Sequence, residues 1–184
     1  MKSLKNLGDQ PAGIPILADD VLEFHAARLL LLIEVCGIAG RIDGLTKMAK
    51  LDFFVRYPQF FDEVCRHLGR QSDNTKTLRT VESSMIRFHY GPWDSRYYHV
   101  LSYLEAKALI EVERDGRMYK LRLTDVGRSI AKRTGQSPAY ADLVKHMKRV
   151  KEVLGSKAGS TLKELVYKVF GEEVAARALG EVIK

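Results

Sequence analysis

The chain has few cysteines and no long apolar run, and these two shortages exclude whole classes of protein. Its 184 residues include two cysteines, Cys36 and Cys65, without a CxxC motif or paired histidines. This pattern predicts reduced core thiols of a cytoplasmic protein and excludes a disulfide scaffold and a zinc finger. The longest apolar run, residues 29–33, is far shorter than the roughly 20 residues of a membrane-spanning helix. No apolar segment follows the N-terminal lysines, so we expect no signal peptide.

The motifs that usually carry enzyme chemistry are also missing. The sequence has no GxxxxGKS/T or GxGxxG phosphate-binding loop, no GxSxG nucleophile elbow and no HExxH metal motif. Its five histidines are scattered, and the acids near expected helix starts already serve as helix caps. We therefore expect a protein that is not an enzyme, needs no cofactor or metal and has no small-molecule substrate.

What the chain does have is enough apolar sequence for a core and a modest excess of positive charge. Apolar residues make up 46% and charged residues 29% of the sequence, which predicts a folded globular protein. Thirty lysines and arginines against 23 acids give a net charge of +7. Cations and acids number nine and nine in residues 1–70, twelve and eight in 71–135, and nine and six in 136–184. The excess favours a polyanionic partner without establishing nucleic-acid binding.

Glycine, proline and capping residues divide the first half of the chain. Residues 1–18 contain two glycines and two prolines and predict an irregular arm. Asp20 precedes a glutamate by three residues, the spacing of a capping box, and predicts a central buried helix that ends near Gly37. Asp43 and Pro58 predict the starts of two more helices. In the first of these, the apolar spacing directs Lys47, Lys50 and Asp52 outward.

The signals of the middle and C-terminal regions are less uniform. Residues 70–77 are wholly polar and predict a linker, and residues 78–88 have helical spacing, although 85–90 fits a strand equally well. Asp94 is expected to cap a further helix. Three helices are expected after Pro138, at about 139–154, 161–170 and 172–183.

The clearest local signal is a β-hairpin. Residues 109–114 and 117–123 alternate between apolar and polar, and Asp115-Gly116 supplies the positive φ values of a type I′ turn. Thr124 is expected to cap the helix that follows, from residue 125 to about 133. The alternation predicts two faces, with Tyr119, Leu121 and Leu123 on one and Met118, Lys120 and Arg122 on the other.

A helix, a tight hairpin and another helix resemble the second half of a winged helix-turn-helix. Residues 103–110 (YLEAKALI) and 121–128 (LRLTDVGR) are similar to many bacterial winged-helix proteins, in which the first helix reads DNA and the hairpin is the wing. Winged helices serve both as DNA readers and as protein-docking modules, so the fold alone does not choose the function. The expected fold is mainly α with a small β-hairpin (α+β), with an arm at 1–18, an elaborated winged-helix domain at 19–135 (wing about 110–123) and a C-terminal helical extension at 136–184.

Two further segments resemble the middle component of ABC-three-component systems, the Lamassu-type antiphage operons. They are residues 44–58 (GLTKMAKLDFFVRYP) and 85–98 (MIRFHYGPWDSRYY), within a likeness that covers residues 20–134. The resemblance implies a non-catalytic accessory subunit that binds an SMC-like ABC ATPase and couples DNA sensing to an effector subunit in bacterial antiphage defence. The alternative is a winged-helix transcriptional regulator that binds DNA as a homodimer, and a third possibility is a protein adaptor without DNA contact.

Three groups of residues are candidates for contact with DNA or with a partner. The predicted wing carries cations that can follow a phosphate backbone, although interleaved acids fit a solvated face equally well. Aromatic residues near position 93 favour core packing, with a nucleobase platform or a partner anchor as alternatives. An apolar stripe on a basic C-terminal helix predicts core or subunit docking. The candidate DNA contacts are Arg96, Arg114, Arg117, Lys120 and Arg122. The candidate partner contacts are Trp93, Tyr97, Tyr98, Lys145, Met147, Lys148 and Arg149.

Overall fold

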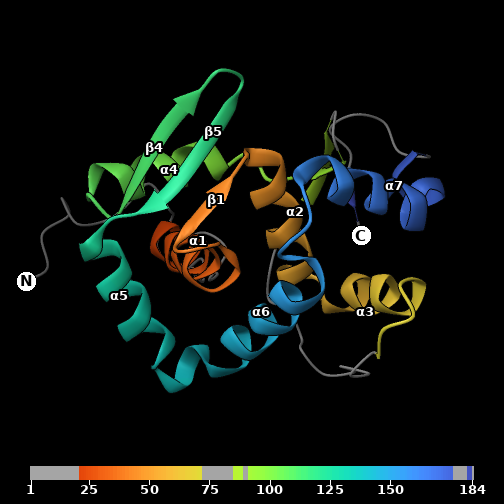
Figure 1. Cartoon of the computed structure of the whole chain (residues 1–184), viewed down its shortest axis with the longest axis horizontal. Coiled ribbons are helices and arrows are strands. Elements are labelled where there is room, and N and C mark those ends of the chain that lie inside the picture. Colours follow the sequence, from red (N-terminus) through yellow and green to blue (C-terminus); the bar gives the residue numbers. More distant parts are fainter. Residues whose placement is uncertain (1–20, 72–84, 89–90, 176–181, 184) are drawn as a thin grey trace, which may run out of the picture.

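A central helix organises the computed structural model, which describes residues 21–71, 85–88, 91–175 and 182–183 (Figure 1). This helix, α1 (Leu22–Cys36), is buried on nearly every side, as its apolar sequence predicts. Its N-cap is Val21, which makes no side-chain capping bond. The expected cap, Asp20, lies outside the described residues.

Two helices follow α1 at the predicted positions, but only one of them begins as expected. α2 (Leu45–Arg56) has Gly44 as its N-cap, with φ of 98° and no side-chain capping bond. The prediction that Asp43 caps this helix is wrong, because Asp43 ends a short strand and pairs with Arg41 instead. α3 (Pro58–His67) begins at Pro58, as predicted, since proline has no N–H to lose in the first turn.

The predicted hairpin is present and gains a third strand. β4 (Ile110–Asp115) pairs with β5 (Met118–Leu123), and β5 pairs on its other edge with β1 (Arg41–Asp43). All pairs are antiparallel, in the order β1-β5-β4. Leu121 and Leu123 are buried while Arg122 is exposed, which confirms the predicted alternation for residues 121–123, whereas Tyr119, expected on the same face as the leucines, is exposed at the tip. Three residues are too few for a period-two pattern, so β1 gave no sequence signal.

The turn of the hairpin differs from the prediction. Asp115 pairs with Met118, so the two-residue loop is Gly116-Arg117 and not Asp115-Gly116. Gly116 has φ of 60°, whereas Arg117 is not among the positive-φ residues. One positive φ at the first loop position is typical of a type II′ turn, in which glycine is preferred there.

The helices on either side of the hairpin differ in how their N-termini are capped. α5 (Asp125–Gly135) follows β5, and its predicted cap is confirmed, because Thr124 Oγ1 accepts a hydrogen bond from Gly127 N at 2.9 Å. α4 (Tyr97–Ala106) precedes β4 and has Arg96 as its N-cap. Asp94 is therefore not the cap. It lies two residues before Arg96, and its carboxylate accepts from Arg96 N at 2.9 Å, in the turn that precedes the helix.

The remaining elements are two C-terminal helices and a small second sheet. α6 (Ala141–Leu154) follows a short 3₁₀ turn, Pro138–Tyr140, and α7 (Gly159–Ala175) contains one non-helical residue, Phe170. The second sheet has the order β3-β2-β6, formed by β2 (Met85–Phe88), β3 (Gly91–Trp93) and β6 (Val182–Ile183). The extended alternative for 85–88 is thus confirmed, and the helix expected through residue 183 is wrong at 182–183.

The C-terminal helices belong to the same core as α1 and α2. Met147, Val150 and Leu154 of α6 and Leu162 and Val166 of α7 are fully buried in one hydrophobic cluster with the earlier helices. Figure 1 shows α5 and α6 wrapping around one side of α1 while the hairpin projects from the other. The described architecture is mainly helical with two small three-stranded antiparallel sheets, which confirms the α+β class. None of the described helices is both long and apolar enough to cross a membrane.

Candidate functional site

The outer face of the three-stranded sheet carries cations that are matched by acids. Residues paired across neighbouring strands point to the same face, so the acids of β4 and β1 flank the cations of β5. A hydrogen bond from Lys120 lowers the pKa of the Asp115 carboxyl, as expected for a formed pair. The ion pairs on this face are Lys120 with Asp115 at 2.8 Å, Arg122 with Glu113 at 3.8 Å and Arg41 with Asp43 at 2.9 Å.

Of the other candidate DNA contacts, Arg96 is half-buried, and Arg114 and Arg117 lie at the hairpin tip. Arg96 donates to both oxygens of Asp94, at 2.9 and 2.7 Å, and points into the protein. Arg114 donates its Nε–H to Gly116 O at 3.1 Å, and Arg117 makes no hydrogen bond or ion pair within the described part of the chain. Only Arg114 and Arg117 of the five candidates therefore lack a carboxylate partner among the residues that the structure describes.

We predict that duplex DNA binding by the isolated protein is weak and depends on the hairpin tip. We expect no sequence preference and a Kd for duplex DNA of about 10⁻⁴–10⁻⁶ M at physiological salt. Arg114→Ala/Arg117→Ala should flatten the slope of log affinity against log salt by up to about two units. Lys120→Ala/Arg122→Ala is the matched control, and it should change the slope less because each cation already has an acid partner. Nanomolar preference for one palindrome in a salt titration would contradict this prediction.

Helix α4 offers little to a DNA groove. Its ten residues (YYHVLSYLEA) contain no lysine or arginine. Its exposed positions include Tyr98, Ser102 and Glu105, and the Glu105 carboxylate accepts from Val112 N at 3.2 Å. Base readout in the major groove relies heavily on arginine, lysine, asparagine and glutamine, all of which are missing here. The exposed face of α4 therefore carries Tyr98, His99, Ser102 and Glu105, without a lysine or arginine.

A groove lies where the hairpin tip meets the starts of α2 and α4. We call it the tip groove; it has a volume of about 330 Å³ and is lined by residues 44–46, Trp93, Tyr98 and residues 117–119. Tyr98 is 60% exposed, Met118 41% and Tyr119 37%. Aromatic, methionine and arginine side chains are enriched at protein interfaces, which makes the tip groove a candidate interaction site.

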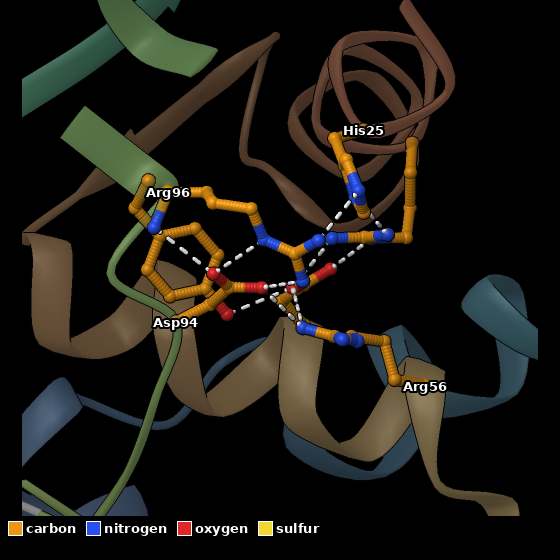
Figure 2. Close-up of polar contacts among 7 residues, drawn as sticks. His25, Arg56, Asp94 and Arg96 are labelled. Atoms are coloured by element: carbon orange, nitrogen blue, oxygen red, sulfur yellow. Dashed lines mark hydrogen bonds and ion pairs between the residues drawn. The ribbon is translucent and has the colours of Figure 1, made fainter. Parts of the chain in front are cut away.

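Beneath the tip groove lies a cluster of buried charges that sequence reasoning missed. The buried ion cluster joins α1, α2 and the segment before α4, and Figure 2 shows its side chains converging from these three elements. Asp52 accepts from Arg28 Nε at 2.9 Å and from the Tyr97 hydroxyl at 2.8 Å. The cluster consists of His25, Arg28, Asp52, Arg56, Asp94, Arg96 and Tyr97.

The second carboxylate of the cluster ties α2 to the chain that enters α4. Asp94 accepts from Arg56 at 2.8 Å as well as from Arg96. Burial alone would raise the pKa of the Asp94 carboxyl, but the hydrogen bonds from Arg96 and the charge of Arg56 lower it well below its usual range. The carboxylate thus stays ionised, and its contribution to stability is present at neutral pH and lost only in acid.

The buried ion cluster supports an aromatic wall of the tip groove. Burial and the nearby Asp52 carboxylate raise the pKa of Tyr97 well above its usual value, so its hydroxyl remains a donor. The Trp93 ring packs edge-on against Tyr97, with centroids 5.2 Å apart and planes at 89°, and lies 5.8 Å from the ring of Tyr98. Asp52 therefore positions Tyr97, and Tyr97 in turn supports Trp93.

The candidate partner residues divide between the tip groove, the core and α6. Trp93 is half-buried and Tyr98 exposed, and both line the groove. Tyr97 and Met147 are buried to 1% and 0% exposure, which removes both from any surface that a partner can reach. On α6, outside the groove, Lys145 and Lys148 are exposed, and Arg149 donates to Gln71 O at 3.1 Å and lies 3.7 Å from Glu152.

Two charged residues of α2 lie opposite to their predicted side. Lys50 and Asp52 were expected to face outward, but they are 1% and 0% exposed. The prediction was wrong because α2 contacts α1 on one side and α7 on another. The buried face of the helix is therefore wider than the stripe of apolar residues from which it was predicted. The Arg28–Asp52 pair could have been suspected from the sequence, because each residue is a charged position within a strongly apolar segment.

The burial of Lys50 predicts a pH-dependent effect on stability. Burial, and to a smaller extent the charge of Lys163, lower its pKa from 10.5 to about 7. Between these two pKa values the unfolded chain binds one proton more than the folded one, so this term makes stability rise with pH. The variant Lys50→Met should therefore gain most over the wild type at pH 6, and its advantage should shrink by pH 9. An advantage in urea unfolding that is equal at both pH values would contradict this assignment.

The described residues hold neither a metal site nor a reactive thiol at Cys36. No group of three histidines, cysteines or carboxylates there could hold a metal ion. Burial raises the pKa of the Cys36 thiol to about 12, and the thiol donates to Met147 O at 3.4 Å. Cys36 is therefore an inert core residue at neutral pH.

Comparison with known proteins adds no identity: no protein family, curated protein or solved structure matches this chain.

Proposed function

We propose that this protein is a non-catalytic winged-helix accessory subunit that docks onto a partner protein through the tip groove. The sequence resemblance names the SMC-like ABC ATPase of a Lamassu-type complex as that partner. In this proposal the subunit acts in the cytoplasm and couples DNA sensing by the complex to an effector subunit in antiphage defence.

The order of elements supports the winged-helix part of the proposal. The chain runs through α1, β1, α2 and α3 before it reaches α4 and the β4–β5 hairpin, and β5 pairs with β1. α4 then occupies the place of the recognition helix, and the hairpin that of the wing. β2 and β3, inserted before α4, and the added α6 and α7 account for the elaboration.

One observation carries the docking role: three of the five exposed large apolar side chains among the described residues, Tyr98, Met118 and Tyr119, surround a hollow of about 330 Å³. A DNA reader should instead present cations and amides on α4 and an unpaired basic wing. Here α4 has neither lysine nor arginine, and Lys120 and Arg122 are neutralised by neighbouring acids. The geometry therefore favours a protein partner over an operator.

Contact with DNA as a second role has a supporting observation on α5 and α6, in addition to the two arginines of the hairpin tip. Exposed cations on α5 and α6 outnumber the acids on those helices, which suits a weak, sequence-independent contact with duplex DNA. Within a complex, such a contact would add to the DNA affinity of the ATPase. The exposed cations are Lys132, Arg133, Lys145, Lys148 and Lys151.

Co-expression with the genes that neighbour its own tests the proposed function. We expect the protein to elute together with an SMC-like ATPase on a sizing column at physiological salt, because apolar docking resists salt while surface ion pairing does not. Elution of the two proteins as separate peaks, or a locus without such an ATPase, would contradict the proposal. Tight binding to an operator near its own gene would favour the regulator instead.

A further inference from the structure

We infer that the tip groove takes a short acidic segment of the partner protein, with an apolar side chain in the hollow and carboxylates against the hairpin tip. The inference rests on the proposed function and names the chemistry of the partner at the same site. Three features of the groove carry it: its apolar walls, the sign of its charge and the acids that border it.

The walls of the tip groove fit one large apolar side chain. Trp93 of β3 and Tyr98 of α4 line the groove, and β5 contributes Met118 and Tyr119. The Trp93 ring is held by Tyr97 from the core side, so this wall is rigid before a partner arrives. Methionine beside rigid aromatics lets a pocket adapt to the shape of the incoming group. An aliphatic or aromatic anchor is the side chain that such a pocket favours.

The charge of the tip groove is positive. Its lining includes no acid, and its charged lining residue is Arg117, which has no ion pair within the described part of the chain. Arg114, opposite Tyr119 in the strand register, likewise lacks a carboxylate partner there. α2 begins at the groove with Gly44 as an uncapped N-cap, which adds partial positive charge to the same end. Two guanidiniums at the tip are suited to bidentate binding of carboxylates.

The borders of the tip groove distinguish an acidic peptide from a nucleic acid. The acids beside the lining segments, Asp43 and Asp115, are already occupied by Arg41 and Lys120 and do not compete for the two arginines. Along the outer face, Glu111 and Glu113 are exposed next to the hairpin strand that a phosphate backbone would have to follow. A short acidic peptide can contact the two arginines alone. A nucleic-acid strand, with one phosphate per nucleotide, would also lie against Glu111 and Glu113 and be repelled by them.

The chain carries its own reporter for the test. Trp93, its single tryptophan, lines the groove, so its fluorescence reports on occupancy. The full-length protein is titrated with the tryptophan-free peptide Ac-SEFDLES-NH2 and with its uncharged counterpart Ac-SQFNLQS-NH2. We expect saturable changes in emission with Kd below about 1 mM for the acidic peptide. The uncharged peptide should bind at least about tenfold more weakly, which corresponds to one bidentate arginine contact of about 1.4 kcal/mol.

Variants assign the binding to the groove. Arg117→Gln should weaken binding of the acidic peptide about tenfold, and Arg133→Gln, an exposed arginine on α5 outside the groove, should leave it unchanged. Absence of saturable binding, equal binding of both peptides, or equal binding by the Arg117 variant would overturn the inference. Tighter binding of a thymidine oligonucleotide than of the acidic peptide would overturn it in favour of single-stranded nucleic acid. Co-elution with the ATPase would then still stand, so failure here is distinct from failure of the proposed function.

Discussion

Replacing Asp52 by asparagine is expected to lower the free energy of unfolding by about 3–5 kcal/mol, the usual cost of removing one partner from a buried ion pair. The change leaves the buried Arg28 guanidinium without its carboxylate and weakens the acceptor of the Tyr97 hydroxyl. Both Asp52 and Arg28 are at most 1% exposed, so water cannot replace the lost contacts. The measurement is urea unfolding followed by far-ultraviolet circular dichroism.

The control for this variant is an exposed acid in the neighbouring helix. Glu63 lies 3.8 Å from Arg66 on the surface of α3, and Glu63→Gln should change stability by about 0.5 kcal/mol or less. A loss below about 1 kcal/mol for Asp52→Asn would show that the buried ion cluster does not stabilise the fold, and the account of how Trp93 is positioned would fail with it.

Replacing Tyr98 by alanine is expected to weaken binding of the partner at least about thirtyfold, the effect of losing a hot-spot residue worth about 2 kcal/mol. The ring is 60% exposed in the free protein, so its removal should change the free energy of unfolding by about 0.5 kcal/mol or less. Affinity is measured by surface binding of the purified ATPase to immobilised wild-type and variant protein, and stability by urea unfolding of the same samples.

Val126→Ala is the matched control for Tyr98→Ala. Val126 is 58% exposed on α5 and does not line the tip groove, so its truncation should leave affinity unchanged. Equal loss of affinity in the two variants, or none in either, would remove the groove from the interface. A large loss of stability in Tyr98→Ala would show instead that the ring serves the core.

Local elements could be predicted from the sequence wherever a single physical rule dominates. Alternation revealed the hairpin, a hydroxyl cap revealed the start of α5, and the fixed φ of Pro58 revealed the start of α3. Predictions based on a lone aspartate as a helix cap were less successful. Asp43 and Asp94 are both bound by arginine, and neither carboxylate caps the first turn of the helix that it was expected to start.

The candidate site was predictable only in part, because its pieces come from three separate segments. Tyr98 was named as part of the aromatic group around Trp93 and Arg117 as a cation of the predicted wing, yet their common groove depends on how the hairpin tip meets the starts of α2 and α4. The cations of the hairpin were counted correctly, whereas their neutralisation depends on strand register, which places Lys120 and Arg122 beside acids. Tertiary pairing thus decides which charges remain available to a ligand.

The central claim, that the tip groove is a protein-docking surface, is tested most directly by a photo-crosslinker at position 98. The aromatic crosslinker p-benzoylphenylalanine would replace Tyr98 in one sample and Val126 in another, each co-expressed with the genes neighbouring its own. Our account predicts a crosslink from position 98 to the SMC-like ATPase and none from position 126. A crosslinker at position 98 that captures no protein, although the complex still forms, would contradict it.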